Sequence, residues 1–139
     1  MDILVLIGRI LFAAIFLSSA VGHLTQTKMM AGYASSKGVP AAGPATFGSG
    51  LLLLAGGLSV LLGIWADLGA LLLVIFLVPT AVLMHGFWKE KDPQTRQLEM
   101  INFQKDIALA GAALALFALI AHTGTDLGLT VTGPLFDID

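Results

Sequence analysis

Four long apolar stretches constrain this chain more than any other feature of its sequence. They cover residues 3–24, 45–66, 68–87 and 103–121. An α-helix of about 20 residues crosses a hydrocarbon layer of about 30 Å, so each stretch is long enough to span a bilayer. Helices are expected because hydrocarbon offers no hydrogen-bond partner to a free backbone amide. The sequence therefore predicts an all-α membrane protein with a four-helix transmembrane domain over residues 1–122.

The composition agrees with a chain that lies largely in lipid. Of its 139 residues, 57% are hydrophobic and 12% are charged, whereas soluble domains carry roughly 25% charged residues. The absence of cysteine excludes disulfides, thiolate nucleophiles and cysteine-ligated metal clusters. A net charge of −2 provides no basic field for nucleic acid. A signal peptide is the alternative for the first stretch, but Asp2 and Arg9 interrupt the required pattern, so we expect a retained helix.

The basic residues predict the orientation in the membrane, because Lys and Arg collect in cytoplasmic loops. Six of the seven lie in or beside two connections: Lys28, Lys37, Lys89, Lys91, Arg96 and Lys105. The other side has only Arg9, within the first stretch. We therefore expect a membrane protein whose connections at 25–44 and 88–102 face the cytoplasm. The N-terminus and a C-terminal tail, residues 123–139, would lie outside, the tail either docked on a partner or disordered.

Both cytoplasmic connections are expected to contain short interfacial helices. In the first, Met29, Met30 and Tyr33 share one side of a helical turn. In the second, Asp92 and Pro93 have the features of an N-cap and a first helical residue. That helix is expected to continue into the fourth span.

Small residues are expected to bring the four helices together, because lipid gives apolar helices no hydrophobic reason to associate. The expected contact faces are Ala14, Ser18 and Gly22 in the first stretch, Ser49, Gly56 and Gly63 in the second, and Ala108, Gly111, Ala115 and Ala118 in the fourth. In the third stretch Pro79 cannot donate to the carbonyl of Ile75, which predicts a kink. The kink is either a packing feature or a functional hinge.

Ionisable residues within membrane spans are costly and mark candidate functional sites. Arg9 has three alternatives: it reaches the outer headgroups, it pairs with Asp67 or an acid of the tail, or it is a fixed cation for a ligand. At the predicted cytoplasmic end, five polar or aromatic residues fall at a similar depth: His23, His85, Trp88, Lys105 and Asp106.

Three interpretations of this inner group remain open. The first is a structural polar cluster that closes the bundle. The second is a site for an isoprenoid-quinone headgroup, in which His or Lys donates to the ring carbonyls and Trp88 stacks on the ring. The third is a haem or metal site that uses His23 and His85, although two histidines at helix ends also arise by chance, and we predict no metal.

Several motifs resemble those of the DoxX family. They are Gly8-Arg9 with Gly22, the loop at residues 36–40, Gly56-Gly57 with Gly63, the run at 84–88, Asp92-Pro93 and the segment at 100–111. The resemblance implies a four-helix inner-membrane protein. It also implies that some relatives are subunits of a thiosulfate:quinone oxidoreductase. Other relatives are linked to membrane complexes that handle oxidative stress with a sulfurtransferase and superoxide dismutase.

Two positions depart from the pattern of the family. Many relatives carry an acid shortly before the paired glycines, where this chain has Leu53-Leu54-Ala55. Relatives often have a basic residue after the glycine of the second apolar stretch, at the position where this chain has Asp67. The first departure removes a candidate proton-handling carboxylate, and the second reverses the charge near the turn.

Three functions are therefore compatible with the sequence. A redox-associated subunit would bind quinone near His85, Trp88 and Lys105 and receive electrons from a partner, since the chain has no redox centre of its own. A structural accessory subunit would pack against a larger complex through its small-residue faces. A small transporter fits less well, because no span has an acid at mid-depth. We expect no stand-alone enzyme, no cofactor beyond a bound quinone or lipid, and membrane lipids and other membrane subunits as partners.

Overall fold

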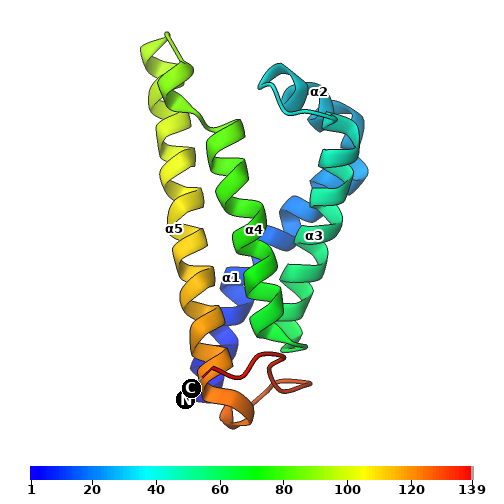
Figure 1. Cartoon of the computed structure of the whole chain (residues 1–139), viewed down its shortest axis with the longest axis vertical. Coiled ribbons are helices and arrows are strands. Elements are labelled where there is room, and N and C mark those ends of the chain that lie inside the picture. The colour runs from blue at the N-terminus through cyan, green and yellow to red at the C-terminus, as the bar shows by residue number, and fades with distance from the viewer. Residues whose placement is uncertain (139) are drawn as a thin grey trace.

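The computed structural model describes residues 1–138, and over this range it is helical and contains no strand. The α-helices are α1 (Asp2–Thr25), α2 (Thr27–Ser36), α3 (Ala42–Leu62), α4 (Ala66–Met84) and α5 (Pro93–Thr123), as Figure 1 shows. Two short 3₁₀ turns, η1 (Phe87–Lys89) and η2 (Gly124–Asp126), follow α4 and α5. Helices α1, α3, α4 and α5 are long and apolar enough to cross a membrane, which confirms the predicted four-span helical bundle.

The helix that begins at Asp92 runs without a break into the fourth span, as predicted. The Asp92 carboxylate accepts a hydrogen bond of 2.8 Å from the backbone nitrogen of Thr95, and Pro93 occupies the first turn. These two residues start a helix of 31 residues. Its first turns therefore extend beyond the predicted span and carry further polar side chains toward the bundle.

The third span differs from its predicted bounds of 68–87. Helix α4 already begins at Ala66, so Asp67 lies in its first turn instead of in a connecting turn. The shift arises because Gly63 ends α3 in the left-handed conformation, with φ of +68°, which a residue without a side chain adopts readily. At the other end α4 stops at Met84, and the backbone of His85 leaves the helical region.

The two connections that hold most of the basic residues lie at one end of the bundle. Helix α2, the predicted helix of the first connection, is at the same end as the start of α5, and both termini are at the opposite end (Figure 1). This grouping agrees with the orientation predicted from the charges. Which end faces the cytoplasm stays a prediction.

The core lies where α3 and α4 pack against each other and against α1 and α5. Its buried residues are Phe16, Ala20, Leu53, Val60, Ala70, Leu73, Leu77, Ala110 and Ala113. A Cβ added to Gly56 would lie 2.9 Å from Leu73, and one added to Gly69 would collide with the side chain of Ser59. The glycines thus permit the close approach of α3 and α4.

The predicted contact face is wrong for α5 and, apart from the half-buried Gly22, for α1. In α1 the buried residues are Arg9, Ala13, Phe16 and Ala20, and Ala14 and Ser18 are exposed. In α5 the buried residues include Asp106, Ala110 and Ala113, and the exposed ones are Ala108, Gly111, Ala115 and Ala118. The physical reason is that Arg9 and Asp106 must find protein partners within the bundle. Each helix is therefore turned so that its charged residue faces inward together with other alanines, such as Ala13 and Ala110, than those predicted.

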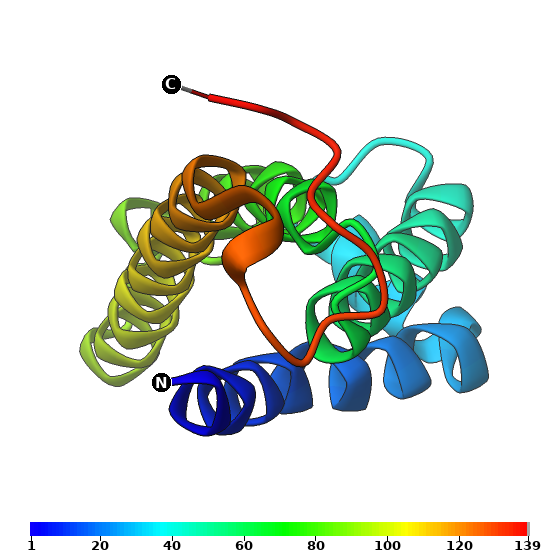
Figure 2. The ribbon, with the colours of Figure 1, turned by 90° about the horizontal axis from the view of Figure 1, so that it is seen from below.

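The C-terminal tail crosses the end of the bundle that carries the termini, as Figure 2 shows from below. The fully buried carboxylate of Asp67 accepts hydrogen bonds of 2.7 to 3.0 Å from the backbone nitrogens of Leu135 and Phe136. The backbone nitrogen of Val131 donates to the carbonyl of Gly63 at 3.0 Å. The tail therefore contacts the chain's own helices through Val131, Leu135 and Phe136, and Asp139 lies outside the described residues.

Arg9 joins three segments at this end of the bundle. Its side chain is 1% exposed and donates to the carbonyls of Val60, Leu61 and Leu129, each at 2.8 Å. Val60 and Leu61 belong to the last turn of α3, whose carbonyls have no helical partner and form the negative end of the helix dipole. Arg9 therefore caps α3 and holds the tail. It does not reach outward, and no acid among residues 1–138 forms an ion pair with it.

Candidate functional site

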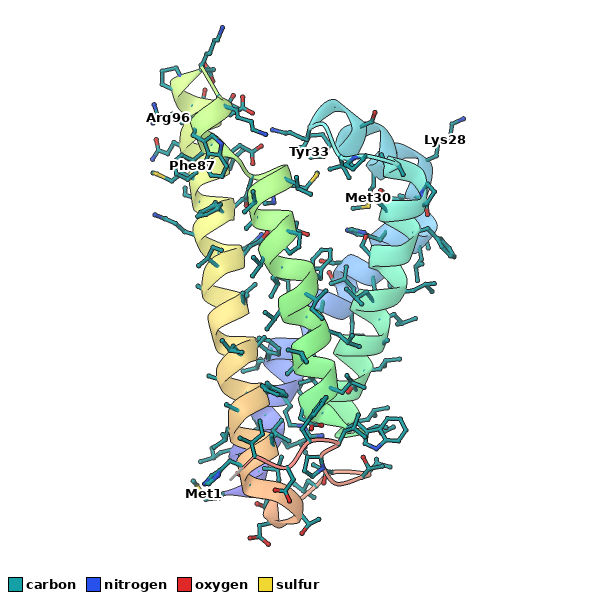
Figure 3. The ribbon with its side chains drawn as sticks, viewed as in Figure 1. Met1, Lys28, Met30, Tyr33, Phe87 and Arg96 are labelled. Carbon is teal, nitrogen blue, oxygen red and sulfur yellow. The ribbon has the colours of Figure 1, made fainter. Side chains whose placement is uncertain are left out.

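An apolar pocket of about 730 Å³ lies between α2, α3 and α4, near the end with the basic connections. Its polar lining residues are His23, Tyr33, Thr46, Ser49, Thr80 and His85, and most of the remaining lining is aliphatic, aromatic or methionine. Met30 of α2 lies on the inner side of this region in Figure 3. The volume falls within the range of about 300 to 1,000 Å³ that is typical of small-molecule sites.

His23, in the last turn of α1, forms one polar part of the pocket wall. Its Nδ1 lies 2.7 Å from Ser49 Oγ and 3.3 Å from the carbonyl oxygen of Thr46. The Ser49 hydroxyl donates to the same Thr46 carbonyl at 2.8 Å, so it offers its oxygen to the histidine as an acceptor. This network favours the tautomer with hydrogen on Nδ1 and leaves Nε2 for a ligand.

His85, which follows the last residue of α4, lies between two carboxylates of α5. Its Nδ1 is 2.7 Å from Glu99 Oε2, and its Nε2 is 3.7 Å from Asp106 Oδ2. The two acids are seven residues apart and therefore project from the same face of α5. The shorter contact fixes the ring through Nδ1, as a partner of a histidine usually does.

Glu99 is the functional candidate that the sequence analysis missed. It is 5% exposed, and its Oε1 accepts hydrogen bonds from Lys37 Nζ at 3.0 Å and from the Tyr33 hydroxyl at 3.3 Å. The seven-residue spacing from Asp106 could have found it, once α5 was expected to begin at Asp92.

Lys37, the C-cap residue of α2, joins two acids. Its Nζ lies 3.0 Å from Glu90 Oε1 and 3.0 Å from Glu99 Oε1. Burial acts to lower the pKa of Lys37, but the hydrogen bonds to Glu90 and Glu99 outweigh it and raise this pKa above the ordinary value. Lys37 therefore carries its positive charge throughout the neutral range.

The other predicted site residues lie beside the pocket instead of in its wall. Lys105 Nζ is 3.6 Å from Asp106 Oδ1 and is about half exposed, so this pair extends the network toward the surface. Trp88 packs edge-on against Phe87 and Phe103, with ring centroids 5.2 and 5.6 Å away, and does not line the pocket. Trp88 is thus not placed to stack on a ligand there.

Pro79 lies inside α4 and lines the pocket. Because it lacks a backbone N–H, the carbonyl of Ile75, which also lines the pocket, has no donor from that position. The predicted kink stays a prediction. Among residues 1–138, no three His, Cys, Asp or Glu side chains are grouped so that they would hold a metal ion.

The comparisons with known proteins identify the family. The family model of DoxX matches residues 4–86, which is more than half of the chain and includes His23 and His85. Glu99, Lys105 and Asp106 lie beyond the matched residues. No curated protein and no solved structure matches the chain. DoxX proteins are small membrane proteins, in agreement with the four apolar helices. The chain is a multi-pass membrane protein and belongs to the DoxX family.

Proposed function

We propose that this protein binds an isoprenoid quinone in the pocket between α2, α3 and α4, as the quinone-binding subunit of a membrane redox complex. The observation that carries the proposal is a pocket of about 730 Å³ that is mainly apolar and has two histidines in its wall, one in α1 and one directly after α4. A quinone has the matching chemistry, because its ring has two polar oxygens and its tail is a hydrocarbon chain. The resemblance to subunits of quinone-linked complexes favours the same ligand.

The two histidines suit both redox states of a quinone. A protonated imidazole nitrogen donates to a quinone carbonyl, and a neutral one accepts from the hydroxyl of the reduced ring. His23 and His85 each use Nδ1 within the protein, so Nε2 is the atom that remains for the ring, and on His85 it lies 3.7 Å from Asp106 Oδ2, beyond hydrogen-bond distance. In this proposal two electrons come from a redox centre on a partner subunit, and two protons complete the reduction.

The remaining wall of the pocket suits an isoprenoid tail. Met29, Met30 and Met84 contribute flexible side chains, which adapt to an irregular apolar ligand. Leu52 and Phe76 add rigid apolar surface from α3 and α4. A tail of repeated branched units would therefore lie against carbon and sulfur atoms without burying unpaired polar groups.

A glycine on the pocket wall permits a sharp test. Gly48 lines the pocket, and a Cβ at this position meets no atom within 4 Å. Gly48→Leu should therefore fill pocket space without disturbing the helices. Gly8 in α1 is equally open and lies outside the pocket, so Gly8→Leu is the matched control. Both variants are purified in mild detergent, and binding of a short-chain ubiquinone and of a menaquinone analogue is measured by equilibrium dialysis.

The proposal predicts that the unaltered protein and Gly8→Leu bind quinone and that Gly48→Leu loses most of this binding. His85→Ala should weaken binding as well, because one ring oxygen loses its partner. An unaltered protein that takes up no more quinone than empty detergent micelles contradicts the proposal. Equal binding by Gly48→Leu and Gly8→Leu contradicts the assigned pocket.

The proposed location is the bacterial cytoplasmic membrane, with the pocket near its inner face. The chain has no cysteine, so single cysteines introduced at exposed positions report the orientation without background. Ser36 and Thr125 are exposed and lie at opposite ends of the bundle. A membrane-impermeant maleimide added to intact spheroplasts should label Thr125→Cys but not Ser36→Cys. The reverse result contradicts the orientation.

A purely structural accessory role is the second candidate, and the exposed small face of α5 favours it. Ala108, Gly111, Ala115 and Ala118 are all exposed, and a Cβ at Gly111 meets nothing within 4 Å. In a bilayer such faces allow another helix to approach closely. If the protein is only an assembly subunit, Gly111→Leu should prevent co-purification with its membrane partner, and Gly48→Leu should have no functional effect.

A further inference from the structure

Helix α2 forms one wall of the pocket, and polar side chains connect it to α5. Met29, Met30 and Tyr33 of α2 line the pocket. The helix itself packs on α3 and on the end of α1. Within residues 1–138, the hydrogen bonds and ion pairs that join α2 and its C-cap to α5 are those of Tyr33 and Lys37 with Glu99. Figure 3 shows Tyr33 on the side of α2 that faces α5.

Glu99 uses its two carboxylate oxygens for two different tasks. Oε1 accepts from Lys37 at 3.0 Å and from Tyr33 at 3.3 Å, and both donors belong to the α2 segment. Oε2 is 2.7 Å from Nδ1 of His85, which lines the pocket. One rigid carboxylate group therefore connects the wall of the pocket to a histidine that the proposed ligand would contact.

We propose that Glu99 is a positioning residue that couples the placement of α2 over the pocket to the orientation of His85. The inference rests on the proposed function, because it concerns the regulation of the same pocket. When α2 is in place, Lys37 and Tyr33 hold Oε1, and the fixed carboxylate directs the His85 ring through Oε2. When α2 moves away, Glu99 loses these donors and no longer holds the ring in one orientation.

The burial of Glu99 is the physical reason for this coupling. The residue is 5% exposed, so a carboxylate oxygen that loses its donors is poorly hydrated. An unpaired buried acceptor is unfavourable, and more so when it is charged. The carboxylate would therefore turn toward water or toward another donor, and its second oxygen would leave Nδ1 of His85. Entry of a ligand past α2 would thus change the histidine that the ligand meets.

The neighbours of His85 define the variants that separate coupling from direct contact. Glu99 and Asp106 face the ring from α5, and His23 of α1 lines the same pocket. Lys37 has no hydrogen bond or ion pair with His85, and it shares only Glu99 with it. The contacts that connect Lys37 to His85 therefore run through Glu99.

The experiment uses the full chain in lipid nanodiscs without added quinone. Because the chain has no cysteine, spin labels at Ser36→Cys and Gln97→Cys, both exposed positions, report the distance between α2 and α5. The ring nitrogens of His85 are followed by ¹⁵N NMR at a fixed neutral pH, with His85→Gln used for assignment. The variants are Lys37→Met and Glu99→Gln. Lys28→Met is the control, because Lys28 of α2 points away from the bundle in Figure 3.

The coupling predicts that Lys37→Met lengthens or broadens the spin-label distance and also shifts the His85 nitrogen signals. Glu99→Gln should do both as well, Lys28→Met should do neither, and Lys37→Arg should restore both readouts. A Lys37→Met protein in which α2 moves and His85 is unchanged overturns the inference. A protein in which neither readout changes also overturns it.

Added quinone separates this inference from the proposed function. A short-chain ubiquinone is titrated into the same nanodiscs, and bound quinone is counted after washing. Coupled changes without quinone binding contradict the proposed ligand and support the coupling. Quinone binding with an unchanged His85 in Lys37→Met supports the proposed ligand and contradicts the coupling.

Discussion

Replacement of Arg9 by methionine should destabilise the bundle more than any other single change at the end with the termini. The side chain is 1% exposed and donates three hydrogen bonds of 2.8 Å to the carbonyls of Val60, Leu61 and Leu129. Methionine fills similar space and can serve none of these carbonyls. The variant therefore tests whether a buried cation caps α3 and holds the tail.

The expected magnitude follows from the three carbonyls. A buried acceptor that loses its donor costs about 1 to 3 kcal/mol. Because Val60 and Leu61 are near the end of α3, partial hydration should reduce this cost, and about 3 to 5 kcal/mol in total is the expected loss. Arg9→Lys keeps the charge at the negative end of the helix dipole but loses the planar fork, so we expect roughly half of that loss.

The assay is unfolding by sodium dodecyl sulfate in mixed micelles. Trp65 lies next to this site, where its backbone nitrogen bonds the Thr132 hydroxyl at 2.9 Å, and its fluorescence reports local unfolding in a Trp88→Phe background. Lys28→Met is the control and should change the free energy of unfolding by less than about 0.5 kcal/mol. If Arg9→Met unfolds at the same detergent fraction as this control, the capping role assigned to Arg9 is wrong.

Three further predictions follow from the same contacts. Gly63→Ala should lower the free energy of unfolding by about 1 to 3 kcal/mol, because φ is +68° and the added Cβ would lie 2.6 Å from Arg9 Nη2. The same unfolding assay measures this loss, and an unchanged unfolding transition contradicts the prediction. Asp67→Ala should free residues 127–138, so chymotrypsin should cleave beside Leu135 faster than in the unaltered protein, and equal rates contradict the tail's attachment. Because the pKa of Lys37 is raised, its ion pairs stabilise the fold fully below the ordinary value of 10.5, and this contribution is lost as the pH rises through the higher folded pKa. Stability measured against pH should show this alkaline loss, and Lys37→Met should lack it.

The helices could be predicted because each depends on local chemistry. Length and apolarity defined the four spans, and Asp92 with Pro93 defined the start of α5. The glycines of α3 also indicated its contact face, because only a residue without a side chain allows Leu73 to approach Gly56 so closely. These signals require no knowledge of where the other helices lie.

The rotation of α1 and α5 could not be predicted from small residues alone. A position one residue along a helix points about 100° away, so Ala13 and Ala14 face opposite environments. Arg9 and Asp106 determine the rotation of their helices, because each needs partners from distant segments. Leu129, for example, is 120 residues from Arg9 in sequence.

The position of the pocket was partly predictable, and the hydrogen bonds and ion pairs around Glu99 were not. The depth of His23 and His85 placed both at the correct end, and both line the pocket. No pattern in the sequence indicated that Trp88 would pack on Phe87 and Phe103 instead of facing a ligand. Glu99 was missed because its donors, Tyr33 and Lys37, come from a connection more than 60 residues away.

Photo-crosslinking with an azido-quinone tests the central claim most directly. The unaltered protein in nanodiscs is irradiated with the probe, and labelled peptides are mapped by mass spectrometry with and without excess unlabelled quinone. The account predicts labels that competitor removes, on α2 around Met29 and Met30 and on α4 around Met84. Labels confined to the outward face of α5 around Gly111, or labels that competitor does not reduce, would contradict it.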